Sequence, residues 1–326
     1  GVTGVQTCAL PISARGSARL LWRRQRAFGQ TGPTMTEAIK IGVLGGSGLY
    51  EIEGFEGRQE VTLSTPYGDP SDAYVCGELE GTPMVFLPRH GRGHRYTPSE
   101  INYRANIWGM RAMGVTHIVS VSAVGSLREE IEPGHFVVVD QFVDRTRHRA
   151  DTFFGDGCVA HVQFADPVCS TVRGALLTAA EEAGVTTHDG GTYVCMEGPQ
   201  FSTRAESELY RSWGMDVIGM TNLTEAKLAR EAGICYATVA MSTDYDCWHA
   251  GHDDVTIDAI LEVMAKNVAA ARRIVRSVVG PLKAAVAAAD SNCRNALQGA
   301  ILTSPDAIDD ATRLRLGPLL DGIDLD

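Results

Sequence analysis

Long apolar runs are missing from this sequence, which limits the classes of protein that it can encode. A membrane-spanning helix needs about 18 consecutive apolar residues. The apolar stretch near 278–289 is interrupted by Gly280, Pro281 and Lys283. With 44% hydrophobic and 21% charged residues among 326, the composition is typical of a globular protein with a sizeable core. We therefore expect no membrane partner.

Basic residues are also scarce. The chain has 29 Lys and Arg against 40 Asp and Glu, which gives a formal net charge of −11 at pH 7. Nucleic-acid binding requires a basic surface that neutralises phosphates. We therefore expect no nucleic-acid partner, although a local pocket with a few donors can still hold a small anion.

Paired cysteine motifs are absent as well. The chain has eight cysteines, and none of them forms a CxxC pair. Cys76, Cys195 and Cys235 lie within apolar runs, which is typical of reduced, buried thiols in a cytosolic protein. The pattern predicts a cytoplasmic location and no disulfide framework.

Residues 1–34 have no acidic side chain but carry five arginines. Such composition is found in organellar leaders, yet Met35 is a suitable start just before the first predicted strand. We interpret 1–34 as a non-native or disordered extension. The folded domain is expected at 35–290, followed by a C-terminal extension at 291–326.

Strand-like and helix-like segments alternate from residue 39 to about 290. This order predicts a single α/β domain with a mixed or parallel sheet flanked by helices. Strands are predicted at 39–44, 84–87, 117–121, 136–139, 192–196 and 234–241. Helices are predicted at 103–113, from an N-cap at Ser170, from Ser202 or Thr203 to Trp213, and from about 256 to 278. Ligands are expected at the carboxyl edge of this sheet, where polar clusters follow several strands.

Gly45-Gly46-Ser47-Gly48 is the first of these clusters. Glycines let backbone N–H groups approach an anion, and the Ser47 hydroxyl adds a donor. The segment lacks the Lys of a phosphate-binding P-loop, the GxGxxG pattern of a dinucleotide site and the second Gly of a nucleophile elbow. It therefore indicates either an anion site or only a turn.

The next cluster, at 89–94, combines Arg89 with His90 and His94. Arg has a fixed fork of donors that matches phosphate oxygens. The two histidines have the spacing of metal ligands on a helix, but the intervening glycines argue against a helix, so we expect no metal site. An anion site and a solvated basic loop both remain open.

Two further clusters contain small and aromatic residues. The segment 122–126 is small enough to let a flat ligand or an anion contact the backbone, although a tight turn explains it equally well. In the segment 197–202, Phe201 can stack on a purine and Ser202 can donate to an anion at a helix start. A core role for Phe201 and a capping role for Ser202 are the alternatives.

Asp244 and Asp246 follow a long apolar strand. In an extended chain, side chains two residues apart share a face, so both carboxyls would point into one pocket. Two neighbouring, partly desolvated carboxyls raise one pKa, and a protonated Asp can protonate a purine ring nitrogen. Solvated acids in a surface turn are the alternative. Together, the clusters suit phosphorolysis of an N-glycosidic bond.

The stretch from residue 39 to about 289 resembles the trimeric purine-nucleoside phosphorylase superfamily, and within it the 5′-methylthioadenosine phosphorylases. The matching segments are 42–49, 89–92, 102–108, 125–130, 140–146, 197–207 and 240–248. The resemblance implies a central mixed, partly barrel-like sheet ringed by helices, a homotrimer, and no metal or organic cofactor. Nucleoside and inorganic phosphate would be the small-molecule partners, with phosphate as co-substrate.

The resemblance also implies roles for individual residues. Asp244 would hydrogen-bond N7 of the purine and protonate it, and Asp246 would bind the 6-amino group. Phosphate would be held by Ser47, Arg89, His90, Ser122, Ala123, Ser202 and Thr221. Base and ribose would contact Phe201, Ala123, Val124 and Met220, and the methylthio group would contact His161, Ile257, Ile260 and Leu261, partly from a neighbouring subunit.

Departures from the family pattern and rival functions set limits on this interpretation. Ser47 and Ser122 replace the Thr of many relatives, and 222–225 lacks a Pro often found before Glu225. A phosphorylase of 6-oxopurine nucleosides or methylthioinosine is the nearest rival, although a neutral amide would suit a 6-oxopurine better than Asp246. A nucleoside hydrolase, a dinucleotide-dependent oxidoreductase and a non-catalytic nucleoside-binding protein are rivals of other classes.

Overall fold

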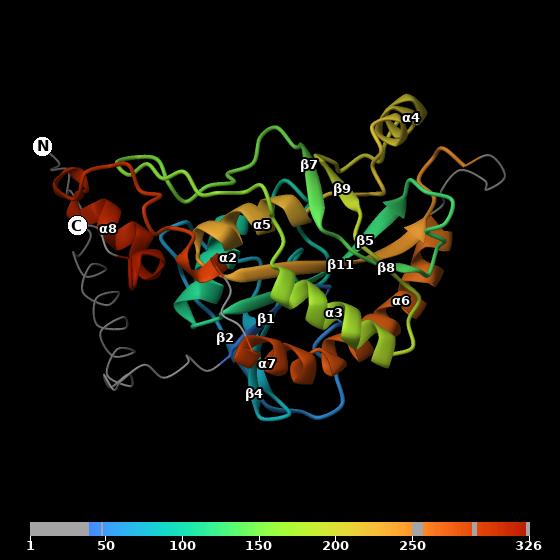
Figure 1. The fold of residues 1–326 in the computed structure, drawn as a ribbon, viewed down its shortest axis with the longest axis horizontal. Helices are drawn as coiled ribbons and strands as arrows, with labels where there is room; N and C mark the ends of the chain where they lie inside the picture. The colour runs from blue at the N-terminus through green and yellow to red at the C-terminus, as the bar shows by residue number, and fades with distance from the viewer. Residues whose placement is uncertain (1–38, 47, 250–256, 289–291, 324–326) are drawn as a thin grey trace, which may run out of the picture. The chain divides into compact units, whose positions relative to one another are not determined.

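The computed structural model describes residues 39–46, 48–249, 257–288 and 292–323 (Figure 1). The expectation for the 1–34 extension therefore lies outside the described residues. Within the described ranges, no helix is long and apolar enough to cross a membrane.

Eleven described strands form one mixed sheet. They are β1 (Ile41–Gly45), β2 (Phe55–Val61), β3 (Tyr74–Leu79), β4 (Thr82–Pro88), β5 (His117–Ser126), β6 (Phe136–Val138), β7 (Gln141–Arg145), β8 (Thr187–Asp189), β9 (Thr192–Met196), β10 (Val217–Gly219) and β11 (Cys235–Asp244). The main order is β2-β3-β4-β1-β5-β10-β9-β7, and β11 pairs with both β5 and β6. These pairings branch at β5 and, over the described strands, do not close into a barrel.

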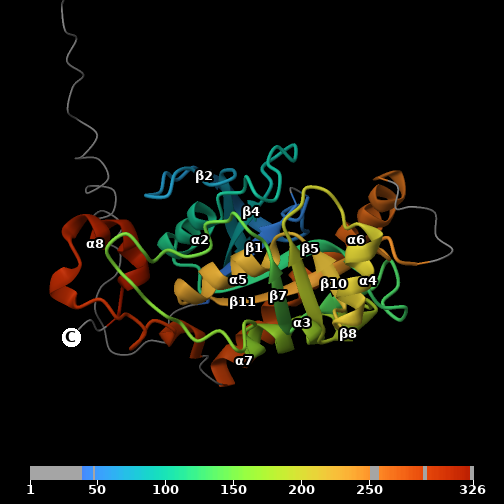
Figure 2. The same cartoon turned by 90° about the horizontal axis from the view of Figure 1, so that it is seen from above.

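Helices cover both faces of the sheet (Figures 1 and 2). They are α2 (Tyr103–Ala112), α3 (Ser170–Glu182), α4 (Arg204–Ser212), α5 (Asn222–Glu231), α6 (Ile257–Ser277), α7 (Val279–Ala288) and α8 (Asp310–Leu316), with short 3₁₀ segments η1 (Asn292–Asn295), η2 (Pro305–Ala307) and η3 (Gly317–Leu320). The predicted α/β domain with a mixed sheet and flanking helices is confirmed.

The two faces of the sheet bury two different cores, because successive side chains of a strand point to opposite sides. On β5, Val119 and Val121 pack with the face covered by α3, α6 and α7, whereas Ile118 packs with α2 and α5. On β11, Val239 and Tyr236 divide in the same way. Both strands are buried along nearly their whole length, which explains their continuous apolar sequence.

The helix starts follow local capping chemistry. Thr203 caps α4 in a capping box with Glu206, as one of the two predicted starts requires. The prediction of Ser170 as an N-cap is wrong, because Cys169 occupies the cap position and Ser170 is the first helical residue. Asn102 caps α2 through its side chain.

The segment after residue 291 packs on the same unit as the sheet. Leu297, Leu316 and Leu319 are buried in the core that contains α2 and α5. The backbone of Ala160 also bridges Ile301. The C-terminal segment is therefore part of the described core, and its boundary with the preceding domain stays a prediction.

Candidate active site

The carboxyl ends of β5 and β11 bring the predicted acids to one point. The two strands are parallel neighbours, and their register places Ser122 beside Ala240 and Asp244 beside Gly125. The register shifts between Ser242 and Asp244, as it does at a β-bulge, which redirects the side chains at the end of a strand. Asp244 is therefore the last residue of β11 rather than part of a following loop.

Asp244 and Asp246 lie together against Gly125. A Cβ on Gly125 would lie 3.1 Å from Asp244 Oδ1 and 3.3 Å from the Cβ of Asp246. The backbone N–H of Asp246 donates to Asp244 Oδ1 at 2.8 Å, and Thr243 Oγ1 donates to Asp244 Oδ2 at 2.6 Å. The predicted extended backbone is wrong, because Asp246 has a left-handed φ of 51° and reaches the site through a turn.

Burial raises the pKa of both carboxyls. For Asp244 the hydrogen bonds from Thr243 and from the backbone of Asp246 oppose this rise without cancelling it, and the negative charge of Asp246 adds to it. The pKa of Asp246 is also raised by burial, although the nearby hydroxyls of Ser207 and Ser202 lower it in part. Among the described residues, Asp246 Oδ2 is buried without a hydrogen-bond partner. The pair thus combines a carboxyl with a raised pKa and a buried oxygen that a ligand N–H can satisfy.

Arg89 follows β4 directly and lies in a buried ion pair beneath these strand ends. Its Nε donates to Glu225 Oε1 at 2.6 Å, and only 4% and 2% of the two side chains are exposed. Its Nη2 donates to the Ser120 hydroxyl at 2.6 Å, and Nη1 donates to the carbonyl of Val121 at 2.7 Å. Glu225 raises the pKa of Arg89 despite the opposing effect of burial. The guanidinium is therefore charged and held rigidly, with most of its donors used within the protein.

Ser122 and Thr221 lie where β5 meets the N-terminus of α5. Ser122 Oγ donates to Asn222 Oδ1 at 2.6 Å, and both side chains are buried. Thr221 is the N-cap of α5, and within the described part of the chain its hydroxyl makes no capping bond. A helix N-terminus with a spare hydroxyl favours an anion. Ala123 and Val124 continue β5 from this point toward Gly125.

His90 lies next to Arg89 and is half-buried. Its Nδ1 lies 2.8 Å from the carbonyl of Tyr96, and its ring stacks on that of His94 with centroids 4.2 Å apart. Burial lowers the pKa of His90 to about 4 despite the hydrogen bond to Tyr96. The ring is therefore neutral at pH 7, with Nδ1 as donor to the carbonyl and Nε2 left as an acceptor.

Arg149 joins the loop after β9 to the residue after β10. Its Nη2 donates to the carbonyl of Glu197 at 2.8 Å, its Nε pairs with Glu197 Oε1, and its Nη1 donates to the carbonyl of Met220. A Cβ on Gly198 would lie 2.6 Å from Met220 Sδ, so this loop passes directly over Met220. The hydrogen bonds of Arg149 and the contact with Gly198 fix the position of Met220, the predicted ribose contact.

Phe201 and Ser202 lie beyond this loop. Phe201 is 60% exposed, whereas Ser202 is half-buried and its carbonyl accepts from Cys247 Sγ at 3.4 Å. The hydroxyl of Ser202 donates to Met196 Sδ at 3.8 Å, and it lowers the pKa of Asp246 in part. A core role for Phe201 is therefore wrong, and its ring is open to a ligand.

The structure does not bring all of the residues predicted to border the methylthio group to the carboxyl ends of β5 and β11. His161 is exposed, and its backbone N–H donates to Ala300 in the C-terminal segment. Ile257, Ile260 and Leu261 belong to the first turns of α6, but their side chains lie outside the description. The predicted phosphate ligand Ser47 also lies outside the described residues.

A separate hollow of about 890 Å³ lies between α3 and α7. Its walls include Glu80, Ser170, Thr178 and Pro281. The predicted site residues do not line it. Because the perturbed carboxyls and the buried guanidinium converge at the strand ends, we take those ends, and not this hollow, as the candidate active site.

Three residues that build the site were not predicted as site residues. Glu225 neutralises Arg89, Asn222 positions Ser122, and Arg149 connects Glu197 with Met220. Glu225 and Asn222 lie in α5, where nearly every side chain is buried, and a polar residue in such a helix is a signal of a buried polar network. For Arg149 the sequence holds no local signal, because its partners are 46 to 75 residues away.

Sequence comparison gives an independent result. The sequence signature of the phosphorylase superfamily matches residues 40–280. The chain is 60% identical over 277 residues to S-methyl-5′-thioadenosine phosphorylase of Geobacter sulfurreducens, covering 85% of this chain and 96% of that protein. The match includes the strand ends described above.

Comparison of structures agrees with it. A methylthioadenosine phosphorylase from an Antarctic soil metagenomic library superimposes with a TM-score of 0.82 at 48% identity, covering 87% of this chain and 100% of that one. A mutant adenosine/methylthioadenosine phosphorylase from Schistosoma mansoni, solved with methylthioadenosine, gives 0.72 at 36% identity over 80% of this chain and 99% of that one.

Proposed function

The chain belongs to the phosphorylase superfamily, and from that premise we propose that it catalyses phosphorolysis of 5′-methylthioadenosine to adenine and 5-methylthioribose 1-phosphate. The observation that carries the proposal is the buried pair Asp244 and Asp246 at the end of β11. Relatives that share up to 60% of its residues bear the name of this activity. The enzyme is thus a pentosyltransferase that serves purine and methionine salvage.

Asp244 is the proposed general acid. Its raised pKa favours the protonated form relative to an exposed Asp, and the hydroxyl of Thr243 and the N–H of Asp246 hold its carboxyl in place. As the C1′–N9 bond breaks, its electron pair moves into the purine, and the proton of Asp244 goes to N7. Neutral adenine leaves more readily than its anion. Asp246 accepts a hydrogen bond from the 6-amino group through its unsatisfied oxygen.

Phosphate is the proposed nucleophile, and its oxygen forms the new bond to C1′. We assign its binding to Ser47, Arg89, His90, Ser122, Ala123, Ser202 and Thr221, near the N-terminus of α5. Because Nε2 of neutral His90 is an acceptor, it would accept from a protonated phosphate oxygen. The negative charge of phosphate stabilises the oxocarbenium character of the ribosyl group. The dipole of α5 offsets part of the charge of phosphate, and Arg89, whose charge Glu225 neutralises, contributes its remaining N–H donor.

The base and the sugar occupy the remaining part of the site. Phe201, Ala123 and Val124 are the proposed contacts of the adenine, since the Phe201 ring is open to a ligand. Met220, held by Arg149 and Gly198, is the proposed contact of the ribose. Ile257, Ile260 and Leu261 are assigned to the methylthio group.

A homotrimer completes the proposal. His161 lies on the C-terminal segment with an exposed side chain, and the nearby apolar side chains of Val159 and Leu302 are 46% and 67% exposed. Such apolar exposure is typical of a contact between subunits. We assign His161 to the methylthio pocket of a neighbouring copy. No cofactor or metal takes part, and the cysteine pattern favours a cytoplasmic location.

The test is release of adenine from 5′-methylthioadenosine by the purified chain, with and without inorganic phosphate. The proposal predicts release that depends on phosphate, with formation of one sugar phosphate per adenine. Adenine release without phosphate would indicate a hydrolase. Preference for inosine or methylthioinosine in competition would overturn the assignment of Asp246.

A further inference from the structure

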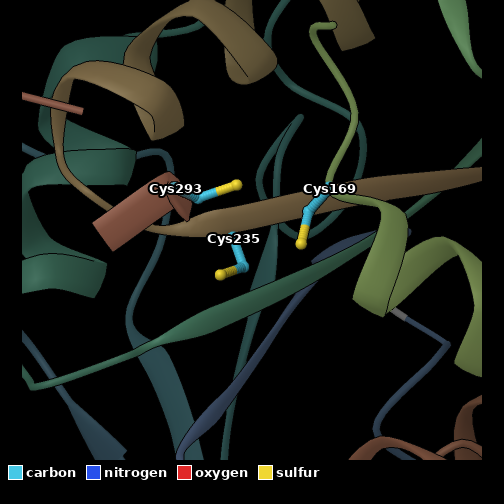
Figure 3. A group of neighbouring side chains, drawn as sticks. All are labelled: Cys169, Cys235 and Cys293. Carbon is cyan, nitrogen blue, oxygen red and sulfur yellow. The ribbon is translucent and has the colours of Figure 1, made fainter. Parts of the chain in front are cut away.

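Three cysteines converge at the amino end of β11, the end opposite to Asp244. Cys169 caps α3, Cys235 begins β11, and Cys293 lies in η1. Figure 3 shows the three side chains arriving from three separate segments of the chain. Their sulfur atoms all lie within 4.8 Å of one another. Because β11 has ten residues at about 3.3 Å each, the cluster lies about 30 Å from Asp244.

The cluster is buried, and its surroundings shift the pKa values of its thiols in different directions. Cys169 and Cys235 are 3% and 0% exposed, and Cys293 is half-buried. Hydrogen bonds from the thiols of Cys235 and Cys293 lower the pKa of Cys169, and the N–H groups of Val172 and Thr171 at the start of α3 lower it further against the effect of burial. The same interactions raise the pKa of Cys235.

We propose that Cys169, Cys235 and Cys293 form a three-thiolate binding site for a thiophilic d¹⁰ metal ion, Zn²⁺ or Cu⁺. Soft thiolate ligands select these ions. Tetrahedral zinc with Zn–S bonds of about 2.3 Å holds its sulfurs about 3.8 Å apart, which the observed cluster accommodates. The ion replaces the remaining thiol protons, which pass to solvent, so no oxidant or reductant is needed.

The site acts on structure and not on the reaction. It joins the start of α3 and the start of β11 to η1, and η1 leads into the C-terminal segment that buries Leu297, Leu316 and Leu319. A bound ion would therefore fix this segment to the sheet. Three converging thiols from distant segments favour a metal over a disulfide, which uses two sulfurs and leaves the third without a role. The proposal does not depend on the proposed phosphorylase activity.

Metal titration of the full chain, reduced, metal-free and without a polyhistidine tag, tests the site. Zn²⁺ is titrated against a chromophoric zinc chelator, and Cu⁺ against a Cu⁺ chelator under argon, so the two ions are distinguished. The proposal predicts one equivalent bound per chain for at least one of them. It also predicts a thiolate-to-cobalt charge-transfer band when Co²⁺ is added to the unmodified chain, a result that needs no variant.

Cys293→Ala and Cys169→Ser are predicted to lose at least about 10-fold in affinity, because even outer-shell changes cost that much. Cys76→Ala is the matched control, since Cys76 is a half-buried thiol on β3 outside the cluster. Equal affinity of Cys293→Ala and Cys76→Ala, or absence of both the cobalt band and Cu⁺ binding in the unmodified chain, overturns the proposal. A disulfide between two of the three after air exposure, together with no metal uptake by the reduced chain, overturns it in favour of a redox pair.

Discussion

The two ends of β11 place different titratable groups in similarly buried surroundings. At the carboxyl end, Asp244 and Asp246 meet beside Gly125, and burial raises the pKa of both. At the amino end, Cys235 meets Cys169, whose pKa is lowered by neighbouring thiols and by a helix N-terminus. Burial alone therefore does not set the pKa of an acidic group. Burial raises this pKa, and hydrogen-bond donors around the group lower it.

The difference follows from the position of each helix relative to the strand. Helix α3 starts beside the amino end of β11 with Cys169 at its N-cap, and the helix start adds to the effect of the neighbouring thiols that lower the pKa of Cys169. Helix α5 starts near the carboxyl ends of the strands, but its first residues contact Ser122, and the donors to Asp244 are the Thr243 hydroxyl and the N–H of Asp246. One end of the strand thus suits a cation and the other suits proton transfer.

Removing the acid at the carboxyl end tests the comparison with the largest expected effect. Asp244→Asn keeps the shape but cannot supply a proton, so kcat/KM for 5′-methylthioadenosine is expected to fall about 100- to 10,000-fold. Steady-state kinetics of adenine release measures it. Cys293→Ala, at the other end, is expected to stay close to the unmodified enzyme. A comparable loss in both variants would mean that the two ends are not functionally separate.

Breaking the buried ion pair below the site is expected to affect stability. Glu225→Gln leaves the charge of Arg89 buried and unpaired, and it should lower the free energy of unfolding by about 3 to 5 kcal/mol. Urea denaturation measures the change. Glu60→Gln is the control, because its pair with Arg92 is exposed and its loss should hardly shift the midpoint. Similar shifts in both variants would contradict a special role of burial.

Adding a methyl group beside Asp244 and Asp246 tests the same end of β11 with a smaller expected effect. In Gly125→Ala, the added methyl meets Asp244 Oδ1 at 3.1 Å, so we expect a loss of about 1 to 3 kcal/mol in stability and about 10- to 100-fold in kcat/KM. Gly174→Ala in α3 is the control, since its methyl meets nothing within 4 Å and should stabilise the helix slightly. Unchanged kinetics of Gly125→Ala would show that the acids tolerate displacement.

Glu231 isolates the effect of burial on a carboxyl that the proposed reaction does not use. Burial raises its pKa to about 7 from 4.5, against hydrogen bonds from the backbone N–H of Phe153 and from Thr152. The folded state binds the proton more tightly, so this stabilisation is complete below about pH 4.5 and is lost as pH rises through about 7. Glu231→Gln should therefore be more stable than the unmodified chain by about 1 to 3 kcal/mol at pH 8 and equal to it at pH 4. Urea denaturation at both pH values measures this, and parallel curves would contradict it.

The sequence predicted the elements whose pattern is decided locally. Strands with continuous apolar runs, such as β9 at Thr192–Met196, were predicted with their bounds, and α2 and α4 were predicted from their periodicity and caps. The strand β2 was missed because its five central residues are exposed and polar, as at the edge of a sheet. The helix α5 was missed because it is buried on nearly every side and shows no apolar stripe.

For the candidate site, the residue types were easier to predict than their geometry. Asp244 and Asp246 were identified, but the bulge in β11 and the left-handed turn at Asp246 depend on pairing with β5. The ion pair of Arg89 with Glu225 and the convergence of the three cysteines join residues more than 50 positions apart. Such contacts follow from the assembled sheet and not from local sequence.

The most direct test of the central claim is the pH profile of kcat/KM at saturating phosphate, from about pH 5 to about pH 9, for the unmodified enzyme and Asp244→Asn. Because Asp244 must be protonated to act, the account predicts a decline with rising pH in the unmodified enzyme that is absent from Asp244→Asn. The same decline in both, or wild-type kcat/KM in Asp244→Asn, would contradict the claim that a buried, protonated Asp244 drives the departure of adenine.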